Sequence, residues 1–368
     1  MDMKRILVFS LAYYPRVGGA EVAIKEISDR ILDIEFEMLT LRFGQEPKME
    51  RVGKVLVHRV GWGGGYLSKI LFAPLAAAEA FALHRQKKFD AAWVMMSYMV
   101  IPLMLLRVLG VHLPYVLTLQ EGDTESHMFG RLRVLPFLPL INAGFRKAQV
   151  VQAISTYLGR WARRRGFTGT LEIVPNGVDI ARFAGEPVAH EGTLLITASR
   201  LVHKNGIDTI IRALVLMPGV QLVVCGSGGD EAKLKALARE LKVEDRVLWR
   251  GHVDHLELPR ALHAADIFVR PSRSEGMGNS FVEAFAAGLP VIATQVGGLR
   301  DFITTEVAWP VMPDSPEHIA EAVGEILGNP EGAKKVVENA KQLVLARYDW
   351  SLVAQDMRQK VFAKVFES

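Results

Sequence analysis

The sequence predicts an α/β fold made of two Rossmann-like halves. Short apolar runs alternate with helical patterns through residues 1–180, and the same alternation starts again at residues 193–199. This alternation is typical of parallel sheets whose strands are joined by helices. A length of 368 residues suits two domains. Hydrophobic residues make up 50% of the chain, as expected where helices cover both faces of a sheet.

The first half begins with a strand and continues with strands separated by helices. The expected strands span residues 5–10, 37–41, 55–60, 91–96, 115–119, 150–154 and 172–174, and the expected helices span 21–32, 69–86, 100–109 and 156–165. Because the first apolar run follows directly on Arg5, we expect no signal peptide. These elements predict an N-terminal domain over residues 1–180.

The second half repeats the pattern. Its expected strands span residues 194–196, 221–225, 247–250 and 266–269, with a further strand from Pro290, and its expected helices span 206–216, 231–241 and 259–264. They predict a C-terminal domain over residues 181–349. Turn residues at 175–179 suit a hinge between the domains. Residues 350–368 predict a last helix capped by Ser351. No strand follows this helix, so we expect it to cross back onto the N-terminal domain.

Residues 274–288 form the main candidate site. They read as a glycine-containing loop followed by a short helix, and free backbone N–H groups at such a helix start favour phosphate. Two carboxylates, Glu275 and Glu283, flank this position. Since a carboxylate beside bound phosphate is repelled, we expect hydroxyl groups to be their partners. Phosphate together with hydroxyl groups indicates a nucleotide sugar.

Two basic residues and a glycine pair extend the predicted site. Arg200 and Lys204 follow the first strand of the second half. They can converge on a diphosphate and stabilise a leaving group without a metal, and solvated surface cations are the alternative. Gly18 and Gly19 open the first helix, where they let backbone approach a ligand. Their spacing does not match the dinucleotide fingerprint, so NAD is unsupported.

Polar side chains follow the apolar run at residues 115–119 and indicate an acceptor site or general acid–base chemistry. These candidates are Gln120, Glu121, Asp123 and His127. A solvated loop is the alternative. We expect no metal, because the chain has no His-x-His, no cysteine pair and no Asp-x-Asp to hold a nucleotide-bound cation.

The charge distribution indicates an anionic partner for the N-terminal half. Residues 1–170 carry 23 Lys and Arg against 14 Asp and Glu, a net charge of +9, whereas the whole chain carries +4. A membrane surface, a phospholipid or a pyrophosphate-linked acceptor fits this excess, and ordinary solubility charge is the alternative. Residues 129–147 mix basic and apolar side chains, which suits an interfacial surface or packed core. Pro136 and Pro139 are expected to interrupt any helix there.

The remaining composition indicates the compartment. A single cysteine, Cys225, fits a reducing environment. The longest run without charge, residues 91–106, is short for a membrane span. We therefore expect a cytoplasmic protein that contacts the inner face of the cell membrane peripherally. We expect no nucleic-acid partner.

These motifs together resemble the retaining glycosyltransferases of the GT4 group, known as group 1, which have the GT-B fold. The strongest element is the E-x7-E pattern of Glu275 and Glu283, preceded by Pro271-Ser272. The glycine pair at residues 18–19, the basic pair, the turn at residues 175–179 and the segment 288–298 support it. The resemblance implies two Rossmann-like β/α/β domains that face each other across a cleft.

The resemblance also implies a role for each site residue. Glu283 would bind the ribose hydroxyls of a UDP- or GDP-linked sugar, and Arg200 with Lys204 would bind its diphosphate. Glu275 would hold the donor sugar, Gly18 and Gly19 would close over the phosphates, and the departing phosphate would help to deprotonate the acceptor. Further donor contacts would come from His252, Val253, Gly276, Met277, Gly278, Asn279 and Ser280.

The sequence departs from the family pattern at one position and leaves two other functions open. Family members often carry a His after the strand that ends here at Leu119, whereas this chain has Gln120. Glutamine cannot act as a base, and Glu121 or His127 are its candidate substitutes. The expected function is transfer of a sugar to a glycan or lipid-linked acceptor. The alternatives are a nucleotide-sugar epimerase on the same fold and a non-catalytic nucleotide-sugar-binding protein.

Overall fold

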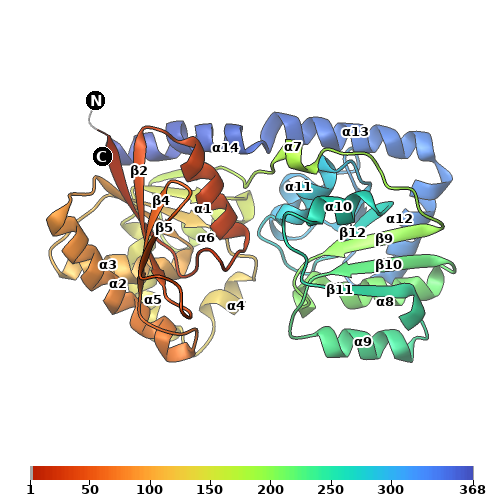
Figure 1. The fold of residues 1–368 in the computed structure, drawn as a ribbon, viewed down its shortest axis with the longest axis horizontal. Helices are drawn as coiled ribbons and strands as arrows, with labels where there is room; N and C mark the ends of the chain where they lie inside the picture. The colour runs from red at the N-terminus through yellow and green to blue at the C-terminus, as the bar shows by residue number, and fades with distance from the viewer. Residues whose placement is uncertain (1–2, 368) are drawn as a thin grey trace. The chain divides into compact units, whose positions relative to one another are not determined.

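The computed structural model describes residues 3–367, which divide into two compact units (Figure 1). Unit 1 contains the residues up to Asn176 and those from Trp350 onward, and unit 2 contains Gly177–Asp349. The expected boundary at residue 180 falls a few residues later, at the start of helix α7 (Ile180–Phe183). Each unit has one sheet with its own hydrophobic core, so the predicted α/β class is confirmed.

Unit 1 contains an eight-stranded sheet in the order β3-β4-β2-β1-β5-β6-β7-β8. The strands are β1 (Lys4–Phe9), β2 (Ile34–Leu41), β3 (Met49–Val52), β4 (Val55–Val60), β5 (Ala91–Met95), β6 (Tyr115–Leu119), β7 (Val150–Ala153) and β8 (Thr170–Ile173). Edge strand β3 pairs antiparallel with β4, and the other pairs are parallel. Sequence reasoning missed β3 because this edge strand has no buried residue and therefore lacks an apolar pattern.

Six helices accompany this sheet up to β8: α1 (Gly19–Arg30), α2 (Tyr66–Gln86), α3 (Val100–Val108), α4 (Glu125–Phe129), α5 (Leu138–Arg146) and α6 (Thr156–Arg164). The expectation that prolines prevent a helix within residues 129–147 is wrong. Pro139 lies in the first turn of α5, where its missing N–H leaves no helical hydrogen bond unmade.

The C-terminal segment completes the core of unit 1. It contains α14 (Trp350–Asp356), a π-helical stretch (Met357–Phe362) and α15 (Ala363–Phe366). The Phe362 ring lies 5.9 Å from the ring of Phe36 on β2 and 5.2 Å from that of Trp93 on β5. The predicted return of this helix to the N-terminal domain is therefore confirmed. The predicted cap is wrong, because α14 begins at Trp350 and Ser351 lies inside it.

Unit 2 contains a six-stranded parallel sheet in the order β11-β10-β9-β12-β13-β14. Its strands are β9 (Thr193–Ala198), β10 (Val220–Cys225), β11 (Val247–Gly251), β12 (Ile267–Arg270), β13 (Val291–Thr294) and β14 (Trp309–Val311). Besides α7, its helices are α8 (Ile207–Leu216), α9 (Glu231–Glu240), α10 (Leu258–His263), α11 (Asn279–Ala286), α12 (Pro316–Gly328) and α13 (Pro330–Arg347). The strand order reverses between β9 and β12, and ligands of such sheets bind outside the carboxyl ends of the strands at this point.

Candidate functional site

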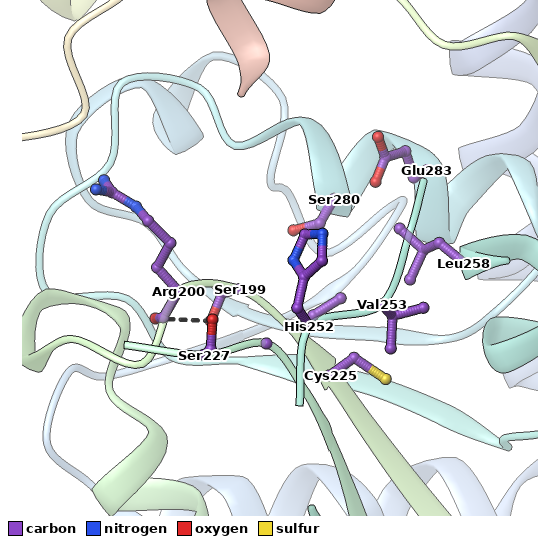
Figure 2. A pocket seen from close by; sticks show the side chains of 11 residues that line it. Ser199, Arg200, Cys225, Ser227, His252, Val253, Leu258, Ser280 and Glu283 are labelled. Carbon is purple, nitrogen blue, oxygen red and sulfur yellow. Dashed lines mark hydrogen bonds between the residues drawn. The ribbon is translucent and has the colours of Figure 1, made fainter. Parts of the chain in front are cut away.

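A cavity of about 210 Å³ lies at the carboxyl ends of β9, β10 and β11, beside the point where the strand order reverses (Figure 2). The residues that line it are Ala198, Ser199, Arg200, Cys225, Gly226, Ser227, His252, Val253, Leu258, Ser280 and Glu283. The cavity therefore brings together predicted donor-binding residues from two loops and one helix. Figure 2 shows Arg200 on one side of the cavity and Ser280 with Glu283 on the other.

Backbone forms the part of this cavity that follows β10. Gly226 has a φ of +146°, and a Cβ atom there would lie 1.8 Å from the carbonyl oxygen of Ser199. A side chain is therefore excluded at this position. The Gly-rich turn at residues 226–230 is a weak sequence signal, yet the structure places Gly226 and Ser227 in the cavity wall.

The start of α11 lies at the cavity, in the segment where the sequence predicts an anion site. Gly278 precedes the helix with a φ of +79°, which L side chains rarely adopt, and this turns the chain into the helix. The first turns of α11 then place Ser280 and Glu283 three residues apart on the side that lines the cavity. Backbone N–H groups at a helix start, together with the helix dipole, favour a phosphate.

A chain of polar contacts orients Glu283. Its side chain is largely buried, and its Oε1 atom lies 3.0 Å from Nε2 of His255. The other ring nitrogen, Nδ1, lies 3.1 Å from a guanidinium nitrogen of Arg182. Arginine can only donate, so Nδ1 accepts and the proton on Nε2 is donated to Glu283. Sequence reasoning missed His255, although it stands three residues after the predicted His252.

Glu275 has an arginine partner that sequence reasoning also missed. Its side chain is 9% exposed and forms an ion pair with Arg270 at the end of β12, while Oε1 accepts a hydrogen bond from the backbone N–H of Gly276 at 3.0 Å. Arg270 also donates to Ser280 Oγ at 2.8 Å and to Asn205 Oδ1 at 3.2 Å. Burial lowers the pKa of Arg270, and the negative charge of Glu275 opposes that shift. The sequence signal that could have identified Arg270 is its position as a charged residue at the carboxyl end of a buried strand.

The loop after β9 carries the predicted diphosphate residues. Arg200 is exposed and lines the cavity, whereas Lys204 is half-buried in the same loop and is not part of the lining. Asn205 Nδ2 donates to the carbonyl oxygen of Arg200 at 2.6 Å, and the carbonyl oxygen of Lys204 accepts from the backbone N–H of Arg273 at 2.7 Å. Asn205 also accepts a hydrogen bond from Arg270. Arg270 is therefore a common partner of this loop and of Glu275.

In unit 1, the predicted glycine pair stands at the start of α1. Gly18 and Gly19 are exposed, and the backbone N–H of Gly18 donates to Oε2 of Glu21 at 2.8 Å. Burial raises the pKa of the Glu21 carboxyl. The pair thus presents backbone at a helix start, as the sequence predicts.

The predicted acceptor-side residues separate into different environments. Gln120 and Asn176 exchange two side-chain hydrogen bonds, at 3.0 and 3.1 Å. Glu121 is 1% exposed, and its two oxygens accept from the backbone N–H groups of Ser97 at 2.7 Å and Gln120 at 2.9 Å. Burial raises the pKa of Glu121. Asp123 is half-buried, and His127 is exposed on α4.

These environments bear on the sequence expectation for Glu121. Both of its oxygens accept hydrogen bonds from backbone at the carboxyl ends of β5 and β6, so a role for this carboxylate as a base stays a prediction. The alternative of a solvated loop for this polar cluster meets a helix at its end, since α4 begins at Glu125. Across residues 3–367, no group of three or more His, Cys, Asp or Glu side chains is arranged to hold a metal ion.

Two family profiles match the chain. The one described as "Glycosyl transferases group 1" matches residues 181–343, and the one described as "Glycosyl transferase 4-like domain" matches residues 18–177. Between them they cover most of both units.

Relatives are about one third identical to the chain over the residues that align. A GDP-mannose-dependent alpha-(1-6)-phosphatidylinositol monomannoside mannosyltransferase of Mycobacterium tuberculosis is 32% identical over 260 residues, which cover 63% of this chain and 66% of that protein. A glycogen synthase of the same species is 32% identical over 200 residues, which cover 52% of this chain and 48% of that protein. The chain thus spans just under two thirds of the length of the mannosyltransferase and about half of the length of the glycogen synthase.

Solved structures share the fold at lower identity. Sucrose-phosphate synthase from Thermosynechococcus elongatus matches with a TM-score of 0.86 and 21% identity, over 99% of this chain and all of that one. The Anabaena protein HepE in complex with UDP-glucose matches with a TM-score of 0.79 and 19% identity, over 98% of this chain and 99% of that one.

Proposed function

Because the chain belongs to the group 1 glycosyltransferases of the GT4 type, we propose that it transfers a sugar from a UDP- or GDP-linked donor to a glycan or lipid-linked acceptor. The transfer retains the configuration of the sugar and needs no metal. One observation carries this proposal. Arg200, the start of α11 and the oriented carboxylate of Glu283 meet at one cavity beside the strand-order reversal of unit 2.

Each part of the cavity suits one part of a nucleotide sugar. Glu283 accepts hydrogen bonds from the ribose hydroxyls, and the backbone at His252 and Val253 lies against the base. The start of α11 binds the diphosphate together with Arg200 and Lys204. Glu275 and the backbone N–H groups of residues 276–278 hold the sugar.

The proposed reaction needs no nucleophile from the protein. The bond between the sugar C1 and the diphosphate oxygen breaks while the acceptor hydroxyl oxygen bonds to C1 on the same face. The acceptor proton moves to the departing phosphate oxygen. Arg200 and Lys204 stabilise the charge that grows on the diphosphate, which is why they are placed among the catalytic residues with Glu275.

The relatives support a membrane-linked acceptor but leave the donor base open. The mannosyltransferase relative is named for GDP-mannose and for a phosphatidylinositol mannoside, whereas the HepE structure contains UDP-glucose. We propose that this chain likewise uses a lipid-linked or glycan acceptor. It would then work at the cytoplasmic face of the cell membrane.

Nucleotide binding should stabilise the protein, and Glu283 should account for much of that effect. In a thermal-shift series with UDP, GDP and ADP, the matching nucleotide at about 100 times its Kd should add about 2.7 kcal/mol to the free energy of unfolding. Glu283→Ala should lose most of this gain, because the ribose hydroxyls lose their acceptor. Glu325→Ala, at an exposed position on α12, is the control. Equal shifts in all three proteins would refute the assigned role.

Incubation with donor alone separates transfer from the alternative functions. A transferase without acceptor should hydrolyse its donor slowly, and Glu275→Ala should stop that hydrolysis because the sugar is no longer positioned. Product analysis by chromatography and NMR measures both. An epimerised nucleotide sugar would favour the isomerase, and an unchanged donor at every enzyme concentration would favour a binding protein.

A further inference from the structure

Helix α2 is apolar on its outer side as well as on its inner side. Phe72, Ala76 and Ala80 are fully buried against unit 1. On the opposite side, Leu67 is 72% exposed, and Ile70, Leu71 and Leu75 are between 36% and 40% exposed. These four residues follow the spacing i, i+3, i+4 and i+8, so they share one stripe, named here the α2 outer face. A surface helix of a soluble domain normally carries polar residues on that stripe.

The exposed apolar surface extends beyond the helix. Trp62 and Tyr66, at the start of α2, are 62% and 54% exposed. The guanidinium of Arg133 lies 5.8 Å from the ring of Tyr66, which places the segment before α5 beside the start of α2. In that segment Leu132 is 85% exposed. Contiguous apolar surface of this kind marks a binding site and not a random scatter of single residues.

The charges around this surface have one sign. Residues 61–78 and 130–147 contain no Asp or Glu. Lys69 lies on α2 itself, and Arg131 and Arg133 lie in the segment that contacts the start of α2. Basic side chains beside exposed aliphatic and aromatic residues complement an anionic lipid bilayer, because the cations attract headgroups while the apolar groups enter the acyl boundary. A soluble protein partner would need a matching acidic rim around an apolar groove.

The buried inner face of α2 argues against a span across a bilayer. By length and composition α2 could span a membrane, since it has 21 residues and an 18-residue stretch of it reaches a mean hydropathy of 1.4. However, its inner face contacts β2 and α3, and crossing would expose the core that Phe72, Ala76 and Ala80 complete. Residues 91–106, which the sequence predicts to be too short for a membrane span, form β5 and most of α3 and are largely buried.

We propose that the α2 outer face, flanked by Trp62, Tyr66 and the basic segment 130–147, docks unit 1 onto an anionic membrane surface. This surface is separate from the donor cavity, which lies in unit 2. Docking would bring the enzyme to a lipid-linked acceptor, yet it does not depend on the identity of the donor.

Vesicle flotation tests the proposal with the full chain. Wild-type protein should float with phosphatidylcholine vesicles containing about 30% phosphatidylglycerol and float far less with pure phosphatidylcholine. The double variant L67E/L71E should lose binding about tenfold or more, because both charges would enter the acyl boundary. R131A/R133A should lose binding to the anionic vesicles only. Nucleotide thermal shifts should stay unchanged in both variants, which shows that they fold and keeps this test independent of the donor site.

A matched control introduces two glutamates at exposed apolar positions outside the α2 outer face. Val215 and Leu216 on α8 of unit 2 are 49% and 51% exposed, so V215E/L216E adds the same charge to an unrelated apolar spot and should float like wild type. Equal flotation of L67E/L71E and wild type would overturn the proposal. So would a wild-type dimer in light scattering that L67E/L71E converts to monomer, because a second copy would then cover this face.

Discussion

Replacing Arg270 with methionine is expected to destabilise unit 2 by about 3–5 kcal/mol and to abolish transfer, because it removes one partner of a buried ion pair. Arg270 and Glu275 are each only 9% exposed. Without the guanidinium, the Glu275 carboxylate stays buried near Glu283 and next to the start of α11. Ser280 and Asn205 also lose their common donor. Urea unfolding measures the stability, and donor turnover measures the activity.

A double-mutant cycle separates positioning from folding. The pair R270M/E275Q removes both charges, so much of the lost stability should return while transfer stays absent, because the sugar has lost its carboxylate. R270K should keep the charge and recover part of the turnover. R273M is the control, because Arg273 pairs with Asp208 and with the exposed Asp314 and should cost less stability. An R270M protein of wild-type stability and activity would show that the pair has no role.

Removing either cation of the loop after β9 is expected to slow turnover more than any other change that leaves the fold intact. Arg200→Ala and Lys204→Ala should each lower kcat by about 10²–10³, the usual cost of removing one donor to a developing negative charge. The donor Kd should change less, since ribose and base contacts remain. Lys204→Arg should restore part of the rate.

Steady-state kinetics with saturating acceptor decide this prediction. Lys233→Ala, at an 83% exposed position on α9, provides a matched loss of charge in the same unit and should leave kcat unchanged. An increase in KM at constant kcat would mean that Arg200 and Lys204 bind donor and transition state equally. In that case their role would be affinity and not catalysis.

Much of the fold could be predicted from local patterns. Buried strands such as β1, β6 and β10 are continuous apolar runs, and their helices carry a clear period. Edge strands were harder, because β3 has no buried residue and β14 contains Pro310. Edge positions tolerate both features, since one side of the strand needs no hydrogen-bonding partner.

The site was predictable where one segment holds the chemistry and unpredictable where distant segments meet. Glu283 is recognisable in the sequence as a charged residue in an otherwise apolar helix. Its hydrogen bond to His255, however, joins positions 28 residues apart, which local patterns do not reveal. Arg270 is visible in the sequence only as the last residue of a strand. Its contacts with Glu275, Ser280 and Asn205 follow from the tertiary fold. Glu121 is a different case, because a charged residue in a polar stretch of sequence is buried and accepts a hydrogen bond from backbone, which local patterns do not show.

The amide pair of Gln120 and Asn176 has a consequence for the pH dependence of the enzyme. Neither side chain titrates, and their two mutual hydrogen bonds persist at any pH at which the protein is folded. A histidine at position 120 would change its charge near neutral pH and would add a limb to the pH–rate profile. With glutamine there, the rate between about pH 5 and 8 is free of that limb, and the side-chain geometry at this position stays the same across that range.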